Sequence, residues 1–455
     1  MIFMNLSGIH IISLVIALTF ALWLSINAGK KVKSAEDYSV GGRSAGASMV
    51  AGGLLGTAVG GAATVGTAQM AFANGFVALW FTLGCTAGFV IQGLFYANRL
   101  LQTRLTTVPE FLVVNFGSNA GPVASVVASA GIFFSVVTSM ITATHLNVFL
   151  FHLPVPLAMI FVIIAALALI YFGGIGGSGL AGLFKMLLLF LAVGISGIFC
   201  FADMGGVSGM QAAFAPSYLG VNFSKNITTL SGMVVGVLCT QTYVQVVFSA
   251  ASKNKAVLGA CLAGIACAPI GLAAALIGMF MKLNHPDIVS INALPLYLVN
   301  YLPEWLAGLG LAALILSVTG SIAGLALGIS TMLANDIYAR FFKVVDSVHI
   351  LRMNRLLMVG VLIGAAVFSY SQLNSQVLFW NYLSMGLRGA GIFVPFSVAL
   401  FFPGRVRKEY GVAAMVLGTL IYFVSDSIFP WRNAIASAVL LTSGICLLGL
   451  RRKID

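Results

Sequence analysis

Apolar runs of about 20 residues follow one another along the whole chain and are separated by short polar breaks. A helix of this length can cross the ~30 Å hydrocarbon layer of a bilayer. Thirteen such runs are expected to be transmembrane helices: 9–27, 45–73, 77–97, 120–146, 153–172, 180–202, 228–250, 257–281, 305–334, 356–371, 377–402, 411–425 and 433–450. The pattern therefore predicts an all-α integral membrane protein with little chain outside the bilayer.

Composition agrees with lipid as the solvent, because 60% of the 455 residues are hydrophobic and 7% are charged. The net charge of +12 is not gathered into a run that could follow phosphates, so we expect no nucleic-acid partner. The six cysteines lie inside apolar runs without metal-ligand spacing and are interpreted as packing residues. The sequence contains no metal box, nucleophile elbow or phosphate loop, and we do not expect an enzyme.

The basic residues predict the orientation of the chain, because cytoplasmic loops are enriched in lysine and arginine. We assign the break that holds Lys30 to the cytoplasm. Inside then lie Lys30, Lys31, Lys33, Arg43, Arg99, Arg104, Lys185, Lys253, Lys255, Arg340, Lys343, Arg352, Arg355, Arg405, Arg407, Lys408, Arg451, Arg452 and Lys453; outside lie Lys225, Lys282 and Arg432. A wrong helix count would mix the two groups. We therefore predict thirteen crossings of the cell (inner) membrane, with the N-terminus outside and the C-terminus in the cytoplasm.

Two of the runs contain many small residues. Nine glycines lie in 42–75, and 308–336 contains the stretch Ser-Val-Thr-Gly-Ser-Ile-Ala-Gly at 317–324. Glycine weakens a helix, and irregular backbone at membrane depth survives only where it lines a cavity or contacts protein. We expect both segments to be loosened helices beside a binding site. The alternative is that the small residues only allow helices to pack closely.

Five short motifs resemble those of the sodium/solute symporter family. They are Glu-Asp-Tyr-Ser-Val-Gly-Gly-Arg-Ser at 36–44, the Gly-Ala-rich segment 60–66, Thr-Val-Pro-Glu-Phe at 107–111, Gln245 with 250–253, and 330–338. The resemblance implies a LeuT-type fold of two inverted five-helix repeats, with one extra N-terminal and two extra C-terminal helices. The implied parts are an N-terminal helix with a basic linker (1–40), the first repeat (41–203), an extracellular loop (204–227), the second repeat (228–402) and the C-terminal helices (403–455).

The resemblance also implies a cation site between carbonyls of the broken first core helix and hydroxyls of the eighth. The carried-over positions are Gly56, Val59, Ser317, Gly320 and Ser321. Oxygen ligands suit a hard cation, and sodium is the expected coupling ion. The chain departs from the family pattern because Gly320 stands where relatives usually carry a hydroxyl. Proton coupling and uncoupled transport remain alternatives.

Candidate solute contacts lie on several core helices. They are Thr57, Gly60, Gly61, Thr64, Ser135, Thr138, Ser139, Met233, Gly236, Val237, Gln241 and Arg388. Positions that align with the sugar-binding side chains of relatives are apolar or small here, including Met233 and Val237, so a sugar is not expected. Ser135, Thr138 and Ser139 form one stripe on a helix, and helix-to-helix hydrogen bonding is the alternative interpretation.

Arg388 lies in the middle of an apolar run, where a charge costs about 2.5–3.5 kcal/mol on insertion scales. The acidic residues all fall at the ends of runs or in loops, so we expect the solute to supply the negative charge. The alternative is that the guanidinium caps carbonyls of a broken helix. The predicted function is sodium-coupled uptake of a small monocarboxylate or similar organic anion by a monomeric carrier. A channel is disfavoured because no charge ring or filter repeat is present.

Overall fold

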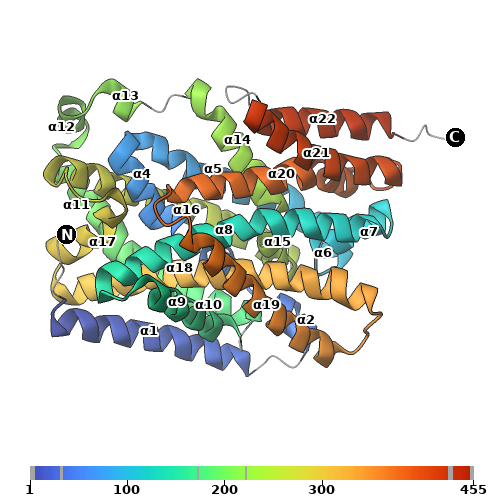
Figure 1. Cartoon of the computed structure of the whole chain (residues 1–455), viewed down its shortest axis with the longest axis horizontal. Coiled ribbons are helices and arrows are strands. Elements are labelled where there is room, and N and C mark those ends of the chain that lie inside the picture. The colour runs from blue at the N-terminus through green and yellow to red at the C-terminus, as the bar shows by residue number, and fades with distance from the viewer. Residues whose placement is uncertain (1–5, 31–33, 172–173, 221–222, 429–433, 451–455) are drawn as a thin grey trace.

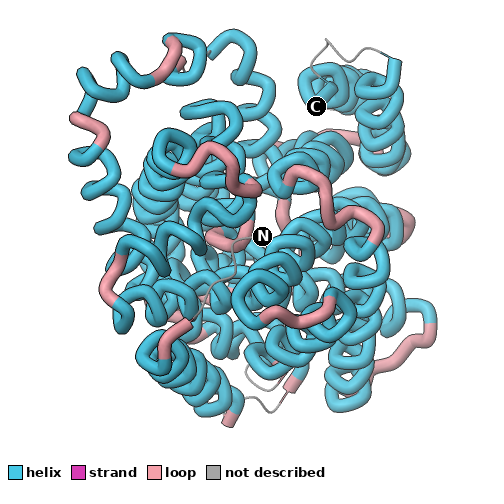
Figure 2. Tube along the Cα trace, turned by 60° about the vertical axis from the view of Figure 1, so that its left-hand side comes forward, coloured by secondary structure: helices cyan, strands magenta, loops and turns pink. Residues whose placement is uncertain are grey.

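The computed structural model describes residues 6–30, 34–171, 174–220, 223–428 and 434–450, which are helical almost throughout and form no β-strand (Figure 2). Most long helices run roughly along the horizontal of Figure 1. α1 (Gly8–Gly29) begins at the left end of that view, and α22 (Ala434–Leu448) ends at the right. An odd number of crossings requires this opposition.

All thirteen predicted runs contain helices. In chain order these are α1; α3 (Ala47–Ala58) with α4 (Thr67–Asn74); α5 (Leu79–Ile91) with α6 (Ala97–Thr103); α8 (Ala120–Phe151); α9 (Val155–Ile170); α10 (Gly174–Leu189) with α11 (Ile195–Asp203); α14 (Phe223–Cys239) with α15 (Gln241–Phe248); α16 (Lys253–Asn284); α18 (Glu304–Met332); α19 (Ser347–Tyr370); α20 (Val377–Phe401); α21 (Lys408–Ile428); and α22. Within the described ranges, eight helical segments have the length and hydropathy to cross a membrane, or nine with the bent pair α14 and α15. The shorter apolar helices α3, α9 and α22 belong to the same bundle.

Short helices connect the spans at the two ends. α2 (Ala35–Val40) and α7 (Val108–Phe116) lie at the end that the charge pattern assigns to the cytoplasm, hereafter the inner end. α12 (Gly206–Ala213), α13 (Pro216–Leu219) and α17 (Ala293–Tyr301) lie at the opposite, outer end. Six of the predicted flanking residues lie outside the described residues: Lys31, Lys33, Arg432, Arg451, Arg452 and Lys453.

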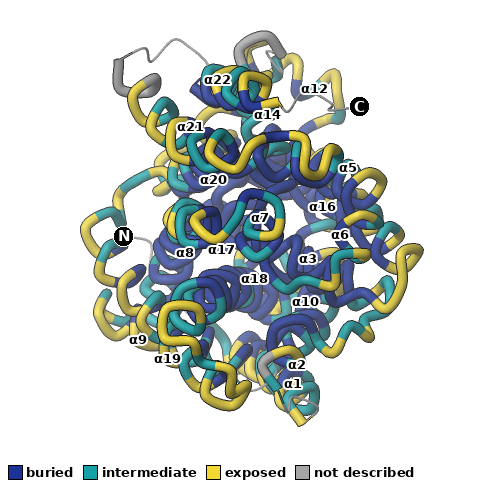
Figure 3. The backbone as a smooth tube through the Cα atoms, turned by 90° about the vertical axis from the view of Figure 1, so that its right-hand side faces the viewer, coloured by how far each residue is buried: buried dark blue, intermediate teal, exposed yellow. Residues whose placement is uncertain are grey.

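α18 occupies the centre of the bundle, and 94% of its apolar window is buried. Viewed from the inner end, α3 and α10 lie beside it in the buried interior (Figure 3). α1 is peripheral and exposes large apolar side chains such as Ile12, Ile16 and Trp23. This exposed apolar surface is what contact with lipid tails requires, since monomeric soluble proteins rarely leave large apolar patches uncovered.

The two segments predicted to be loosened behave differently. The helix through 42–75 is broken between α3 and α4, as predicted. The prediction for 308–336 is wrong, because α18 runs continuously to Met332 and only then widens into the π-helical turn η7 (Leu333–Ala339). The second break lies instead at Thr240, where α14 and α15 meet at 46°. In α18 the small residues allow close packing: side chains of Thr57 and Thr242 lie directly against Gly324 and Gly328.

Candidate functional site

The break after α3 leaves a group of backbone carbonyls free of the usual helical pattern. Val59 closes the helix with φ −83° and ψ 74°, and the chain resumes through the π-helical turn η2 (Ala62–Gly66). A methyl group on Gly60 would lie 2.7 Å from Cβ of Ser321, and one on Gly61 would lie 2.7 Å from Cβ of Thr142. Glycine is therefore required here because α18 and α8 approach the backbone itself.

Glycines also bring α3 and α10 into direct backbone contact. A methyl group on Gly52 would overlap the carbonyl of Gly179, and one on Gly182 would overlap the carbonyl of Gly52. One turn further, a methyl group on Gly56 would lie 3.2 Å from Cα of Gly182. The glycines of α3 therefore serve both the break and the close packing, and this contact carries the next turn of α10 to the broken segment.

The five predicted cation-site residues converge at this break. The Ser317 hydroxyl donates to the Val59 carbonyl at 2.6 Å, and the Ser321 hydroxyl donates to the Thr57 carbonyl at 2.5 Å. A methyl group on Gly320 would lie 3.4 Å from the Gly56 carbonyl oxygen, so α18 faces Gly56 without contributing an oxygen there. The local arrangement is thus three carbonyls of α3 and two hydroxyls of α18.

A residue that the sequence analysis misplaced completes the site. Lys185 lies in the middle of α10 and is 1% exposed, so its assignment to the cytoplasmic boundary is wrong. Its Nζ donates to the Gly56 and Val59 carbonyls, both at 2.7 Å. Lys185 falls inside the predicted run 180–202, and a buried charge in an apolar run was the available signal. Counting every basic residue as a loop marker concealed it.

A vestibule approaches this site from the inner end. It lies between α3, α10 and α15, and its lining includes Met49, Gly53, Leu180 and Val246. Gly53 lies one helical turn from Gly56 along α3. A small separate cavity beside Lys185 is lined by Gly56, Gly182 and Gly320. The vestibule therefore reaches within one helical turn of the carbonyl cluster from the inner end.

The outer end is covered at this position. Tyr218 of α13 donates to the carbonyls of Ala71 and Phe72 at the end of α4, at 2.7 and 2.5 Å. Burial raises the pKa of Tyr218 to about 12. The contact holds the outer loop over the second half of the broken helix.

Arg388 lies beside the second break. It is fully buried in α20, and Nη2 donates to Ser135 Oγ at 3.1 Å and to Met385 Sδ at 2.9 Å. Its Nε and Nη1 are buried without a hydrogen-bond partner. The Arg388 carbonyl accepts from the Cys239 thiol at the end of α14, at 3.4 Å. Among the described residues no carboxylate pairs with the guanidinium.

The other predicted solute contacts fall into separate groups. Ser135 joins Arg388 and also contacts Ser384, hydroxyl to hydroxyl, at 2.7 Å. Thr138 and Thr64 donate to carbonyls of their own segments, and Thr57 packs on Gly324. Ser139 is 3% exposed on α8, and Gly60 and Gly61 line the break. The other three positions lie on α14: Met233 and Val237 face Gly84 and Gly88 of α5, and Gly236 faces Met385 of α20.

Gln241 lies with the motif residues at the inner end. Its Oε1 accepts from the Val108 amide at 2.7 Å, and its Nε2 donates to the Thr106 carbonyl at 3.2 Å. The neighbouring Gln245 donates to the Ser39 carbonyl at 2.7 Å. These bonds tie α15 to the segments that precede α3 and α7.

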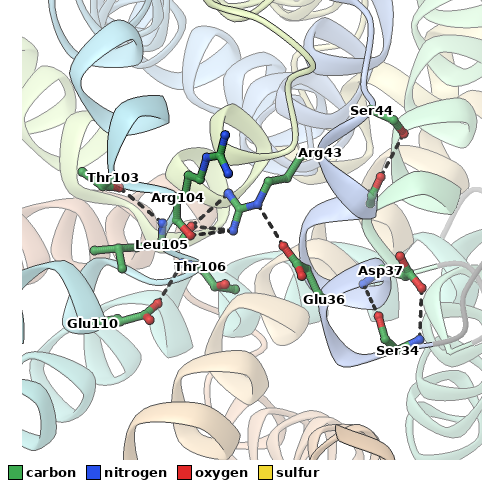
Figure 4. Close-up of polar contacts among 11 residues, drawn as sticks. Ser34, Glu36, Asp37, Arg43, Ser44, Thr103, Arg104, Leu105, Thr106 and Glu110 are labelled. Carbon is green, nitrogen blue, oxygen red and sulfur yellow. Dashed lines mark hydrogen bonds and ion pairs between the residues drawn. The ribbon is translucent and has the colours of Figure 1, made fainter.

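Arg43 joins the same segments from the other side (Figure 4). It pairs with Glu36 at 2.9 Å and donates to the carbonyls of Arg104 at 2.8 Å and Leu105 at 3.3 Å. Gly41 and Gly42 adopt positive φ of 58° and 59°, which turns the chain sharply enough to aim Arg43 back at these partners. The five motifs that carry the family resemblance therefore include a hydrogen-bonded cluster at the inner end.

The family model described as "Sodium:solute symporter family" matches residues 38–418. The chain is 26% identical over 428 residues to the high affinity choline transporter 1 of Homo sapiens, with 87% of this chain and 71% of that protein covered. It is 24% identical over 440 residues to the sodium/proline symporter of Haemophilus influenzae, with 87% and 84% covered.

Two solved structures share the architecture. A substrate-bound, outward-open Na⁺-coupled sialic acid symporter superposes with a TM-score of 0.79 at 16% identity, covering 98% of this chain and 97% of that one. A nucleobase-cation-symport-1 family transporter in a closed conformation gives 0.63 at 14% identity, with 90% and 94% covered. The predicted LeuT-type fold of about thirteen helices is confirmed.

Proposed function

Because the chain belongs to the sodium:solute symporter family, we propose that it is a secondary active transporter that carries a small organic solute by alternating access. One observation carries the proposal: the spans that contain α3 and α14 are both broken, and a vestibule leads from the inner end toward the first break. Broken helices of this kind bind solutes and ions near the midplane of transporters. The proposed orientation has the start of α1 outside and the end of α22 in the cytoplasm of the cell membrane.

Arg388 supports a solute with a carboxylate or similar anionic group. A buried guanidinium with unpartnered Nε and Nη1 can hold a carboxylate through two parallel hydrogen bonds. The proline named for one relative carries a carboxylate, whereas the choline named for another is a cation, which Arg388 would repel. A small monocarboxylate, including a zwitterionic amino acid, is therefore our proposed solute class.

Sodium is the cation named for the family and for the sialic acid symporter. The residues at the α3–α18 site do not fit it, because the Lys185 ammonium already holds the Gly56 and Val59 carbonyls and Gly320 adds no oxygen. This arrangement favours a second candidate for the coupling mechanism, in which a proton gradient takes the place of the sodium gradient.

The proposal is tested on purified protein in two steps. Thermal unfolding is first measured with pyruvate, lactate, propionate, benzoate, L-proline and choline, and a stabilising organic acid is expected. That acid, radiolabelled, is then used in counterflow with preloaded proteoliposomes. Transient accumulation above equilibrium is expected of a carrier, whereas an open pore cannot produce it. If none of the stabilising acids gives counterflow, the proposed function is contradicted.

A further inference from the structure

Lys185 is a buried charge that takes no part in the proposed contacts with the solute. It projects from α10 onto the broken end of α3, and its Nζ lies 2.7 Å from both the Gly56 and Val59 carbonyl oxygens. Both distances are those of charge-assisted hydrogen bonds. No carboxylate of the described residues pairs with it. Its recorded hydrogen-bond partners are thus the two main-chain oxygens that a bound cation would use.

We infer that the Lys185 ammonium is a tethered cation that takes the place of a sodium ion between α3 and α18, so that this site excludes sodium. The inference rests on the proposed function for its meaning in transport. Its binding claim can be tested separately.

The position is suited to a positive charge. The last carbonyls of a helix are unsatisfied within it and form the negative end of its dipole. α3 ends at Ala58, so Gly56 and Val59 present such oxygens to α10. An ammonium has three donors, which serve both carbonyls and leave one over. A tethered ammonium therefore supplies the positive charge that a bound metal ion would bring, and it also donates hydrogen bonds to the same carbonyl oxygens.

The neighbouring helix shows the complementary change. The Ser317 and Ser321 hydroxyls donate to the Val59 and Thr57 carbonyls. These two hydrogen bonds already connect α18 to the break. Gly320, which faces the Gly56 carbonyl between them, lines the small cavity together with Lys185. α18 therefore lacks an oxygen at the point where the ammonium enters, and a second cation there would meet a like charge at contact distance.

The test measures sodium binding to the detergent-purified protein with radioactive sodium, and thermal unfolding in sodium chloride against potassium chloride. Wild type is expected to show no saturable sodium binding and the same midpoint in both salts. Lys185→Ala combined with Gly320→Ser removes the ammonium and adds a hydroxyl. This variant should bind sodium saturably and be stabilised by it, as linkage requires.

Two further variants control the experiment. Lys185→Ala alone removes the ammonium and leaves Gly320 unchanged, so it serves if the double variant does not fold, and it too should acquire sodium binding. Lys255→Met removes an exposed lysine at the start of α16 and should behave as wild type.

Saturable sodium binding by wild type that Ser317→Ala abolishes would overturn the inference. So would failure of every folded Lys185 variant to bind sodium, because the amine would then not be what excludes the ion. Neither result touches the counterflow experiment, whose failure would instead contradict transport itself.

Discussion

Lys185 and Arg388 are two buried cations in matching places of the two repeats. Lys185 lies on α10, the fifth helix of the first repeat, beside the break of α3. Arg388 lies on α20, the fifth helix of the second repeat, beside the break of α14 and α15. They are 1% and 0% exposed. The fold thus places a positive charge against each broken helix.

Their partners differ. Lys185 is held by two main-chain carbonyls, whereas the Arg388 guanidinium has one oxygen and one sulfur partner and two buried nitrogens with none. A buried donor without a partner costs more than a satisfied one. The difference teaches that one charge is satisfied by the protein's own backbone, whereas the other keeps free donors for the anionic group that we propose it binds.

The largest effect is expected from Arg388→Gln. Removing one partner of a buried charge pair costs about 2–5 kcal/mol, which corresponds to about 30-fold or more in affinity. Uptake of the organic acid selected by thermal unfolding should fall by at least that factor, measured in proteoliposomes. Arg388→Lys should restore little, because a point charge cannot form the fork.

Ser384→Ala provides the matched control for Arg388→Gln, because Ser384 lies on the same helix, is equally buried and contacts Ser135. Its uptake should stay within the same order as wild type. Unchanged uptake by a folded Arg388→Gln protein would instead make the guanidinium a structural cap of the broken helix.

The next largest effect concerns how closely α18 packs against the break after α3, where Lys185 binds. Gly60→Ala places a methyl group against the Ser321 side chain, and overpacking of this kind costs about 1–3 kcal/mol. The thermal midpoint should drop, and Gly60→Ala/Ser321→Gly should regain part of the loss. Gly46→Ala, at a position with nothing within 4 Å, should leave the midpoint unchanged. Equal midpoints for Gly60→Ala and wild type would show that α3 and α18 are not locked together.

The long apolar runs predicted nearly all of the helical architecture, because the length of a span follows from bilayer thickness. The nine glycines of 42–75 predicted that the first core helix is loosened, and the family resemblance implied that the free carbonyls lie at Gly56 and Val59. The second break was not predicted, since no cluster of glycines marks Thr240; the contacts of Gly236 and Cys239 with α20 lie beside it. The small residues of α18 allow other helices to pack closely against it, whereas the sequence analysis interpreted them as a sign of irregular backbone.

Arg388 could be singled out because it is a charged residue with apolar sequence on both sides and no acidic residue in the same run. Lys185 has the same description, but its partners are backbone carbonyls, which every residue carries and no sequence pattern marks. The five predicted cation-site positions did meet in space. What they hold depended on a sixth residue from another helix, which only the three-dimensional contacts reveal.

A smaller effect is expected from Ser135→Ala, which removes the one oxygen partner of Arg388 Nη2. A hydrogen bond contributes about 0.5–1.5 kcal/mol net, so the KM of the transported acid should rise about fivefold. The maximal rate should change less than KM, because the charge itself remains. A fall in rate with unchanged KM would assign Ser135 to packing between α8 and α20 and not to the orientation of the guanidinium.

The smallest effect is expected at Arg43, a partly exposed cation that sharpens the contrast with the two buried ones. Its side chain is 23% exposed and that of Glu36 is 59% exposed, and surface ion pairs contribute about 0–1 kcal/mol. Glu36→Gln should therefore change uptake less than about threefold, and added salt should weaken the pair further. Arg43→Ala also removes the bonds to the Arg104 and Leu105 carbonyls and should exceed Glu36→Gln. Comparing the two variants at low and high salt separates the ion pair from the backbone bonds. An Arg43 effect as large as that of Arg388→Gln would mean that the inner-end cluster, and not burial of charge, limits transport.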